Sequence, residues 1–399
     1  MTFAFDRDVR NVAILAVCQA LFMMGQNIMI ISASLVGYDL ATNKALATLP
    51  VTAMIAGTVV STVPASMLMR RIGRRAGFVL GGLLGACGAA IAAYGIHIAE
   101  FWVFVGGIAV IGAYNAVAHY FRFAAADVAP ASFKAHAISL VLSGGVVAGL
   151  IGPEIAKATK DLFLPDVFMG CFVAIAGLQI GVSLLSSFVQ IPNLTAEELK
   201  DKGRPMIEIM RQPTFFVAVV GGMVGYGAMN MLMTATPLAM RDCALPFDDS
   251  AFVIQWHVIG MFAPSFFTGA LIKRFGVLEI MLAGAGLLLA GIGFALAGNA
   301  TWNFWTALFL IGVGWNFTFI GGTTLLTECY TPSERNKTQA ANDFLVFGTM
   351  AIASFLSGVM LHNFGWTQVN LAAVPVIVFS SALVLWLLLR RRAAVAAAA

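Results

Sequence analysis

Long uncharged runs alternate with short charged segments along the whole chain. A helix needs about 20 apolar residues to cross the hydrocarbon core of a bilayer. Twelve runs approach or exceed that length, at residues 11–36, 48–69, 77–97, 101–124, 135–155, 166–190, 213–240, 250–272, 278–298, 302–326, 338–361 and 366–389. The first run is longer than the apolar region of a signal peptide, so we interpret it as a retained helix. The pattern predicts an all-α membrane protein with 12 transmembrane helices.

The composition agrees with this class. Hydrophobic residues make up 60% of the 399 residues and charged residues 11%, whereas a soluble protein has about 25% charged residues. So few charges do not cover a soluble surface, which excludes soluble enzymes, nucleic-acid binders and disordered chains. We expect the lipid bilayer of the cell (inner) membrane as the surroundings, no nucleic-acid partner, and a monomer.

Lys and Arg are distributed asymmetrically between the two ends of the predicted spans. If the spans alternate in direction, all but four of the 23 Lys and Arg fall on one side, the exceptions being Lys44, Lys157, Lys160 and Arg241. Cytoplasmic segments are enriched in these residues. Both termini are therefore predicted to be cytoplasmic, and the net charge of +4 needs no acidic partner.

Two parts of the sequence repeat the same landmarks. A long polar connection at 191–212 separates six spans in 1–190 from six in 213–399. Arg70-Arg71-Ile72-Gly73 recurs 203 residues later as Lys273-Arg274-Phe275-Gly276, and Asp127 with Pro130 recurs after 201 to 202 residues as Glu328 with Pro332. A common offset indicates duplication. We predict two pseudo-symmetric six-helix bundles joined by a cytoplasmic linker.

At these positions the chain resembles the major facilitator superfamily over nearly its full length. Arg71-Ile72-Gly73-Arg74-Arg75 fits the R-x-G-R-R part of the loop signature between helices 2 and 3, and Ala126-Asp127 with Pro130 fits the pattern after helix 4. The aspartate of the loop signature is replaced by Arg70, so the cytoplasmic latch must differ here. The helix 5 glycine signature is partly matched by Gly145, Gly149 and Gly152-Pro153.

The architecture predicts a secondary active transporter in which two halves rock about a central site. The sequence has no G-x-x-x-x-G-K-[ST] phosphate loop for ATP. We therefore expect an ion gradient to supply the energy, preferably a proton gradient, with the gradient of the solute itself as the alternative. We expect no cofactor and no metal, since the His and Cys residues are dispersed. Two alternatives stay open: an exporter of drugs or hydrophobic compounds with this fold, and a membrane-embedded enzyme or lipid-handling protein.

The resemblance implies that helices 1, 4, 7 and 10 line the central cavity, where polar residues indicate function. On these helices Asn27 matches Asn230 at offset 203, and Tyr114-Asn115 matches Trp315-Asn316 at offset 201. Amides donate and accept hydrogen bonds and aromatic faces stack on planar groups. The predicted solute is a small, polar, preferably planar organic molecule. Neighbouring candidates for its binding are Gln26 and Tyr226. The alternative is that the amides only pin helices together.

Several titratable residues have two possible roles. His119 and Arg122 continue the Asn115 face toward the cytoplasm, where Arg122 would bind an anionic group of the solute, pair at the gate or extend into water. Asp343 and His257 are the proton-coupling candidates. Their alternatives are a helix N-terminal carboxylate for Asp343 and a packing residue for His257.

A cytoplasmic gate is predicted from the repeated loops. It contains Arg71, Gly73, Arg74, Asp127, Arg274 and Glu328. We expect Asp127 to pair with Arg71 or Arg74, and Glu328 to pair with Arg274. These ion pairs would hold the cytoplasmic side closed and break when it opens.

Overall fold

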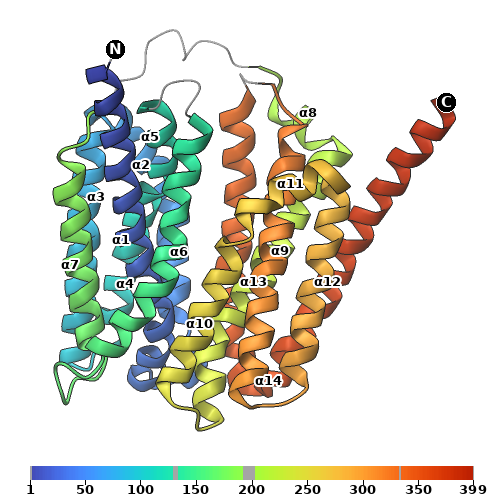
Figure 1. Ribbon diagram of the computed structural model, residues 1–399. Coiled ribbons are helices and arrows are strands. Elements are labelled where there is room, and N and C mark those ends of the chain that lie inside the picture. The colour runs from blue at the N-terminus through green and yellow to red at the C-terminus, as the bar shows by residue number, and fades with distance from the viewer. Residues whose placement is uncertain (1, 129–133, 192–202, 332–333, 399) are drawn as a thin grey trace. The chain divides into compact units, whose positions relative to one another are not determined.

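The computed structural model describes residues 2–128, 134–191, 203–331 and 334–398, and these residues form helices and connecting turns without a strand. The first seven α-helices, α1 to α7, are Thr2–Leu40, Leu49–Ile72, Arg74–His97, Phe101–Ala118, Phe121–Val128, Lys134–Thr159 and Met169–Ser186, with a short 3-10 helix at Lys44–Leu46. The remaining helices, α8 to α14, are Met206–Met210, Pro213–Asp242, Phe247–Phe262, Ser265–Phe275, Val277–Leu296, Thr301–Thr327 and Arg335–Ala398. Figure 1 shows these helices along the chain.

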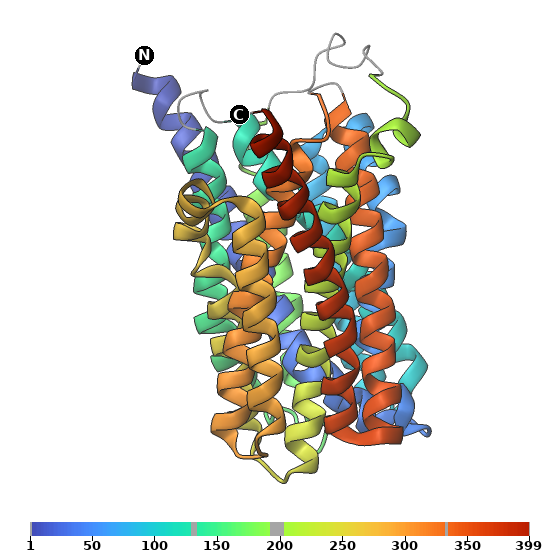
Figure 2. The same cartoon turned by 90° about the vertical axis from the view of Figure 1, so that its right-hand side faces the viewer.

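The all-α fold class is confirmed, and the elements are consistent with twelve spans. Within the described residues, nine helices are long and apolar enough to cross a membrane, or ten if α10 and α11, bent by 43° from each other, form one span. The helix α14 runs through Gly365, whose φ of 79° and ψ of 175° are not helical, so it holds the last two predicted spans. Figure 2 shows the two parts of α14 meeting at the bottom of the view.

Two predicted spans are broken rather than continuous. The fourth divides into α4 and α5 around His119 and Tyr120, and the eighth divides into α10 and α11 at Ala263 and Pro264. Proline lacks the N–H group that would continue a helical ladder and its ring collides with the preceding turn. This explains the second break, whereas no proline lies at the first.

Contacts divide the chain into two compact units. The first contains Met1–Leu194 and Ala244–Gln255, and the second contains Thr195–Cys243 and Trp256–Ala399. In the first unit α1 packs on α6, α2 on α4, and α3 on both α4 and α7. In the second unit α9 packs on α14 and α13, and α12 on α13.

Glycines allow the same close helix approach in both units. A Cβ atom at Gly112 of α4 would overlap the carbonyl oxygen of Met54 in α2, and one at Gly312 of α13 would overlap that of His257 in α10. Close backbone contact through small residues is a main source of helix association in lipid. The two contacts are equivalent, with an offset of 203 residues on the second helix of each unit and 200 residues on the fourth.

The turn after the second span also repeats. Gly73 has φ of 84° and ψ of 155°, and Gly276 has φ of 103° and ψ of 149°. This backbone region is open almost only to glycine. The repeated Arg-x-Gly landmark thus corresponds to one tight turn, used before α3 and before α12.

We predict that Gly73→Ala and Gly276→Ala each destabilise the folded protein by about 1–3 kcal/mol, because alanine is strained in this conformation. Thermal unfolding of the purified protein measures the effect. The control is Gly286→Ala, at a helical glycine where an added Cβ atom would meet no other atom within 4 Å, and this variant should be neutral or stabilising. An unchanged midpoint in both turn variants would contradict the assignment.

Candidate functional site

Buried polar groups without partners lie on α1. Asn27 is 3% exposed and packs against Gly152 of α6, and its Nδ2 has no hydrogen-bond partner among the described residues. Ser34 lies seven residues further on, so it shares this helix face. Its hydroxyl is also buried without a partner in the described part of the chain. Buried polar groups are nearly always hydrogen-bonded, so such groups on one face require an explanation.

The first helix of the second unit, α9, has the same feature. Asn230 is fully buried and its Nδ2 donates a hydrogen bond of 3.1 Å to the carbonyl oxygen of Met350 in α14. Its Oδ1 and the hydroxyl of Thr234, one turn further on, are unpartnered within the described residues. Asn27 and Asn230 therefore lie at equivalent helix contacts. Asn27 lies between α1 and α6, the fifth span, and Asn230 lies between α9 and the first part of α14, the eleventh span.

Gln26 and Asn115 are directly joined. The Nε2 of Gln26 on α1 donates a hydrogen bond of 2.5 Å to Oδ1 of Asn115 on α4. Asn115 is 3% exposed and Gln26 is half-buried. The structure thus brings together two of the predicted site residues, from α1 and α4 of the first unit.

Aromatic rings gather around Tyr226 in the second unit. Its ring meets Trp315 edge-on at 5.1 Å between centroids, Phe319 at 5.2 Å and Phe347 at 6.0 Å. Trp315 stacks on Phe319 at 5.0 Å, and its indole Nε1 is buried without a partner among the described residues. Edge-on and stacked pairs are the preferred geometries of aromatic rings. Tyr226, Phe319 and Phe347 are half-buried, so this cluster keeps accessible ring surface.

Asn316 clamps the break between α10 and α11. Its Nδ2 donates to the carbonyl oxygen of Met261 at 2.6 Å and to Oγ of Ser265 at 2.7 Å, and its Oδ1 accepts from Thr268 at 2.7 Å. Pro264 has no N–H group and interrupts the helix here, and the Asn316 amide supplies a donor to the carbonyl oxygen of Met261 at this break. All three hydrogen bonds of the Asn316 side chain join residues of α10 and α11. Asn316 therefore fits the alternative interpretation, in which the amide only holds helices together.

The predicted pairing of Tyr114-Asn115 with Trp315-Asn316 is wrong by one residue. The glycine contacts give an offset of 200 on α4 and α13, so Asn115 is equivalent to Trp315. One residue turns a helical side chain by about 100°. This rotation directs Asn115 toward Gln26, whereas Asn316 meets α10 and α11.

Tyr114 and His119 lie in the packing of the first unit. Tyr114 is fully buried against Gly81 and Gly85 of α3, with its ring 5.5 Å from that of Phe22. His119 lies at the break after α4, with its ring 6.0 Å from Phe22. The continuous helix expected to carry Arg122 is therefore interrupted, and the side chain of Arg122 lies outside the described residues.

The two proton-coupling candidates have different surroundings. His257 is fully buried, and its Nδ1 lies 2.6 Å from the carbonyl oxygen of Leu308 in α13, as expected for a packing residue. Asp343 is half-buried and lies two turns inside α14, where Asn342 donates to its Oδ1 at 3.2 Å. Asp343 is therefore not in the first turn of its helix.

The expected pairing of Glu328 with Arg274 is wrong. Glu328 pairs with Arg391 at 2.7 Å, while the Arg274 guanidinium lies over the neighbouring ring of Phe275. The long last helix brings Arg391 to the end of α13, which sequence spacing does not reveal. Arg71 is exposed and Arg74 half-buried, and the side chain of Asp127 lies outside the described residues.

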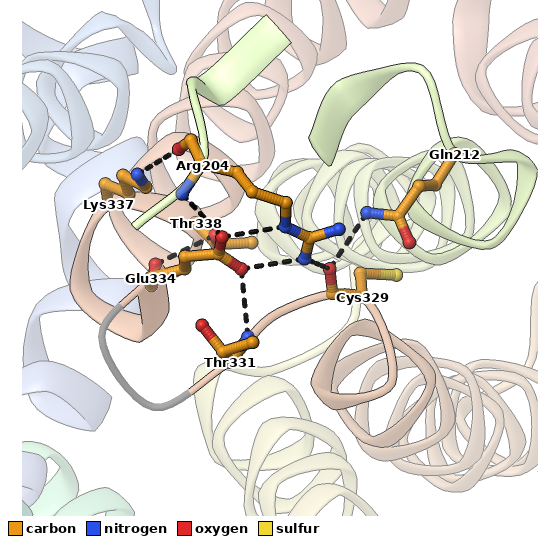
Figure 3. Close-up of polar contacts among 7 residues, drawn as sticks. All are labelled: Arg204, Gln212, Cys329, Thr331, Glu334, Lys337 and Thr338. Atoms are coloured by element: carbon orange, nitrogen blue, oxygen red, sulfur yellow. Dashed lines mark hydrogen bonds and ion pairs between the residues drawn. The ribbon is translucent and has the colours of Figure 1, made fainter. Parts of the chain in front are cut away.

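A further ion pair was not predicted from the sequence (Figure 3). Arg204, at the end of the linker, binds both carboxylate oxygens of Glu334 at 2.7 Å through Nε and Nη2. The backbone N–H groups of Arg204 and Thr331 donate to the same carboxylate at 2.7 and 3.0 Å. The Arg204 guanidinium, followed by these N–H donors, holds the pKa of Glu334 well below its usual range. Glu334 is 1% exposed.

This cluster ties the linker to the connection before α14. Arg204 and Gln212 both donate to the carbonyl oxygen of Cys329, at 3.1 and 2.9 Å, and Lys337 donates to the carbonyl oxygen of Arg204. Glu334 lies two residues after Pro332, just beyond the repeated landmark. Its partner is 130 residues away, and no local pattern identifies such a pair.

Two units of equivalent membrane-spanning helices, with unsatisfied polar groups on the first helix of each, define a multi-pass transport protein. No cluster of metal-binding side chains occurs in the described parts of the chain. The sequence matches the Major Facilitator Superfamily over residues 15–328 and again over 218–398. The chain belongs to this family, and it is a transporter of a small organic solute rather than an enzyme.

Individual relatives agree with this assignment. The riboflavin transporter RfnT of Brucella anthropi is 42% identical over 370 residues, covering 92% of this chain and 93% of the relative. The MFS-type transporter YddS of Bacillus subtilis is 28% identical, covering 88% and 85%. The solved structure of the nucleoside transporter NupG has a TM-score of 0.71 at 12% identity, covering 94% of this chain and 99% of that chain. At this identity the last comparison concerns the fold alone.

We predict that Asn316→Ala lowers the free energy of unfolding by about 1–3 kcal/mol, because it leaves buried groups at the α10–α11 break unsatisfied. Asn115→Ala removes one side-chain hydrogen bond and should have a smaller effect. Thermal unfolding of the two variants gives the order, with Asn299→Ala in an exposed turn as control. Equal midpoints for Asn316→Ala and wild type would rule out the clamp.

We predict that Glu334→Gln destabilises the protein at neutral pH and that the difference shrinks on acidification. A carboxylate whose folded-state pKa is lowered stabilises the fold above its unfolded pKa, about 4.3, and loses this effect as pH falls toward the folded pKa. Unfolding midpoints of both proteins between pH 7 and pH 3.5 test this, with Glu100→Gln at an exposed position as control. A difference that is independent of pH would show that the ion pair does not contribute.

Proposed function

We propose that this protein carries riboflavin across the cell (inner) membrane. The observation that carries the proposal is the riboflavin transporter that is 42% identical over 92% of this chain. The candidate site supports the same solute class. The isoalloxazine ring of riboflavin is planar and has an imide N–H between two carbonyl groups, and its ribityl chain adds hydroxyls. Such a solute offers partners for both donors and acceptors.

The unpartnered groups complement this chemistry. Nδ2 of Asn27 and Nε1 of Trp315 are donors for ring carbonyl or nitrogen atoms, and Oδ1 of Asn230 is an acceptor for an N–H or hydroxyl group. The half-buried ring of Tyr226 provides a face for the isoalloxazine system. Gln26 and Asn115 form a joined pair that exchanges its mutual hydrogen bond for bonds with the solute. In this proposal Asn316 and Tyr114 are structural.

Transport proceeds by alternating access in this proposal. Residues 1–190 and 213–399 rock as two halves about the site, with 191–212 as a cytoplasmic linker and both termini cytoplasmic. The equivalent glycine contacts and the equivalent turns at Gly73 and Gly276 support two halves of one design. Halves of this kind in related folds move largely as rigid bodies.

Protons drive accumulation in this proposal, with Asp343 as the coupling residue. It is a half-buried carboxylate on α14, two turns inside the helix. A membrane-embedded carboxylate that alternates between two states of exposure can bind a proton on one side and release it on the other. The buried packing of His257 makes it the less suitable group.

Proteoliposomes containing the purified protein should take up labelled riboflavin with saturation, and unlabelled riboflavin should compete. We predict that Tyr226→Ala raises KM about tenfold, equivalent to about 1.4 kcal/mol of lost stacking, and that Tyr226→Phe does not. Tyr94→Ala, at an exposed ring on α3, is the matched control. Saturable transport of another solute without transport of riboflavin would overturn the proposed substrate.

We predict that Asp343→Asn abolishes accumulation driven by a pH step but leaves exchange of labelled for unlabelled riboflavin intact. The amide cannot gain or lose the proton, while the solute site is unchanged. The control is Asp248→Asn, at an exposed residue in the first turn of α10. Wild-type accumulation by the Asn variant would remove Asp343 from coupling, and wild-type uptake that ignores the pH step would favour uniport.

A further inference from the structure

A cavity of about 410 Å³ lies in the first unit, apart from the residues considered for the solute. It is formed where the N-terminal parts of α1 and α3 meet the segment that follows α7. Its lining residues are Arg10, Ile14, Arg75, Ser187, Phe188 and Gln190. This size is within the range of small-molecule sites in proteins.

The polar lining of the cavity suits an anion. Arg10 and Arg75 are exposed, and neither forms an ion pair with a described carboxylate. The side-chain amide of Gln190 adds hydrogen-bond donors, the Ser187 hydroxyl, which donates to the carbonyl oxygen of Leu184 at 2.6 Å, adds an acceptor for headgroup hydroxyls, and none of the six lining residues is acidic. The helix α3 begins at Arg74, so its positive end lies beside Arg75 and adds to the attraction for negative charge. Two arginines with neutral donors match a phosphate group.

The wall of this cavity is held in place before any ligand binds. Asn11, next to Arg10, is 1% exposed. Its Nδ2 donates to the carbonyl oxygen of Gln190 at 3.0 Å, and its Oδ1 accepts from the backbone N–H of Gln190 at 3.2 Å. This reciprocal pair fixes the segment after α7 on α1. The two arginines are therefore positioned by folded elements rather than by loops alone.

Exposed apolar side chains continue from the cavity along the same helices. Leu184 on α7 is 62% exposed, and Phe188, just after the end of α7, is 66% exposed. On α1, Ile14 lines the cavity and Val17, three residues further on, is 48% exposed. In a membrane-spanning chain such a surface contacts acyl chains. A free phosphate would contact only the polar cavity, whereas a phospholipid would contact the cavity with its headgroup and the apolar surface with its acyl chains.

We propose that this cavity binds the phosphate headgroup of an anionic phospholipid. Arg10 and Arg75 contact the phosphate, Ser187 and Gln190 bind the polar remainder of the headgroup, and an acyl chain lies along Phe188 and Leu184. Basic pockets at the ends of transmembrane helices recognise anionic headgroups through this chemistry. The site depends on the membrane location of the chain and not on which solute it carries.

Native mass spectrometry of the full-length protein, delipidated in detergent and titrated with phosphatidylglycerol, tests the proposal. We expect Arg10→Gln/Arg75→Gln to raise the dissociation constant at least about tenfold, and Arg10→Lys/Arg75→Lys to recover most of the affinity. The charge-matched control, Arg211→Gln/Arg390→Gln, removes two exposed arginines elsewhere and should stay within about twofold of wild type.

Two further arms separate the lipid from other ligands. Phosphatidylcholine with the same acyl chains should bind more weakly than phosphatidylglycerol, and glycerol 3-phosphate should bind far more weakly than either. Phe188→Ala, which keeps both arginines, should weaken the binding of phosphatidylglycerol and leave that of glycerol 3-phosphate unchanged. Unchanged phosphatidylglycerol affinity in the double Gln variant, or equal affinity for glycerol 3-phosphate, overturns the proposal.

Discussion

The hydrocarbon interior of a membrane offers no partner for a hydrogen bond, and this constraint governs every level of the structure. Backbone groups are satisfied inside helices, which explains the all-helical composition of the described chain. Where Pro264 interrupts the helix, the side chain of Asn316 donates to the carbonyl oxygen of Met261 and to the hydroxyl of Ser265. Where helices must approach closely, Gly112 and Gly312 remove the side chains that would keep them apart.

Because of the same constraint, buried polar groups without a hydrogen-bond partner are informative. Asn27 and Ser34 on α1, and Asn230 and Thr234 on α9, keep buried donors or acceptors unused within the described residues. Other orphaned atoms, such as the hydroxyl of Tyr114, lie in packed regions of the helix bundle. The repetition of the feature on the first helix of both units distinguishes Asn27 and Asn230, and it agrees with a solute that completes their hydrogen bonds.

Much of the fold could be predicted, because the length of an apolar run and the position of its flanking charges indicate whether a segment lies in the membrane or in water. The all-α class follows from such patterns, and the recurrence of the segments that end at Gly73 and Gly276 is visible in the sequence, where the structure adds the shared turn. Partners across the fold could not be predicted in this way. The Arg204–Glu334 pair joins residues 130 positions apart, and Glu328 meets Arg391 from the far end of α14. The one-residue shift between Asn115 and Asn316 depends on helix packing, which sequence spacing alone does not resolve.

We infer that the buried amide of Asn27 is kept for the solute rather than for a neighbouring helix, and the proposed binding site depends on this inference more than on any other. Its test is thermal unfolding of wild type and Asn27→Leu, each with and without riboflavin. Removing an unsatisfied buried amide relieves about 1–3 kcal/mol, so we expect a ligand-free variant at least as stable as wild type that gains little from riboflavin. A ligand-free variant clearly less stable than wild type, with full stabilisation by riboflavin, would contradict the inference.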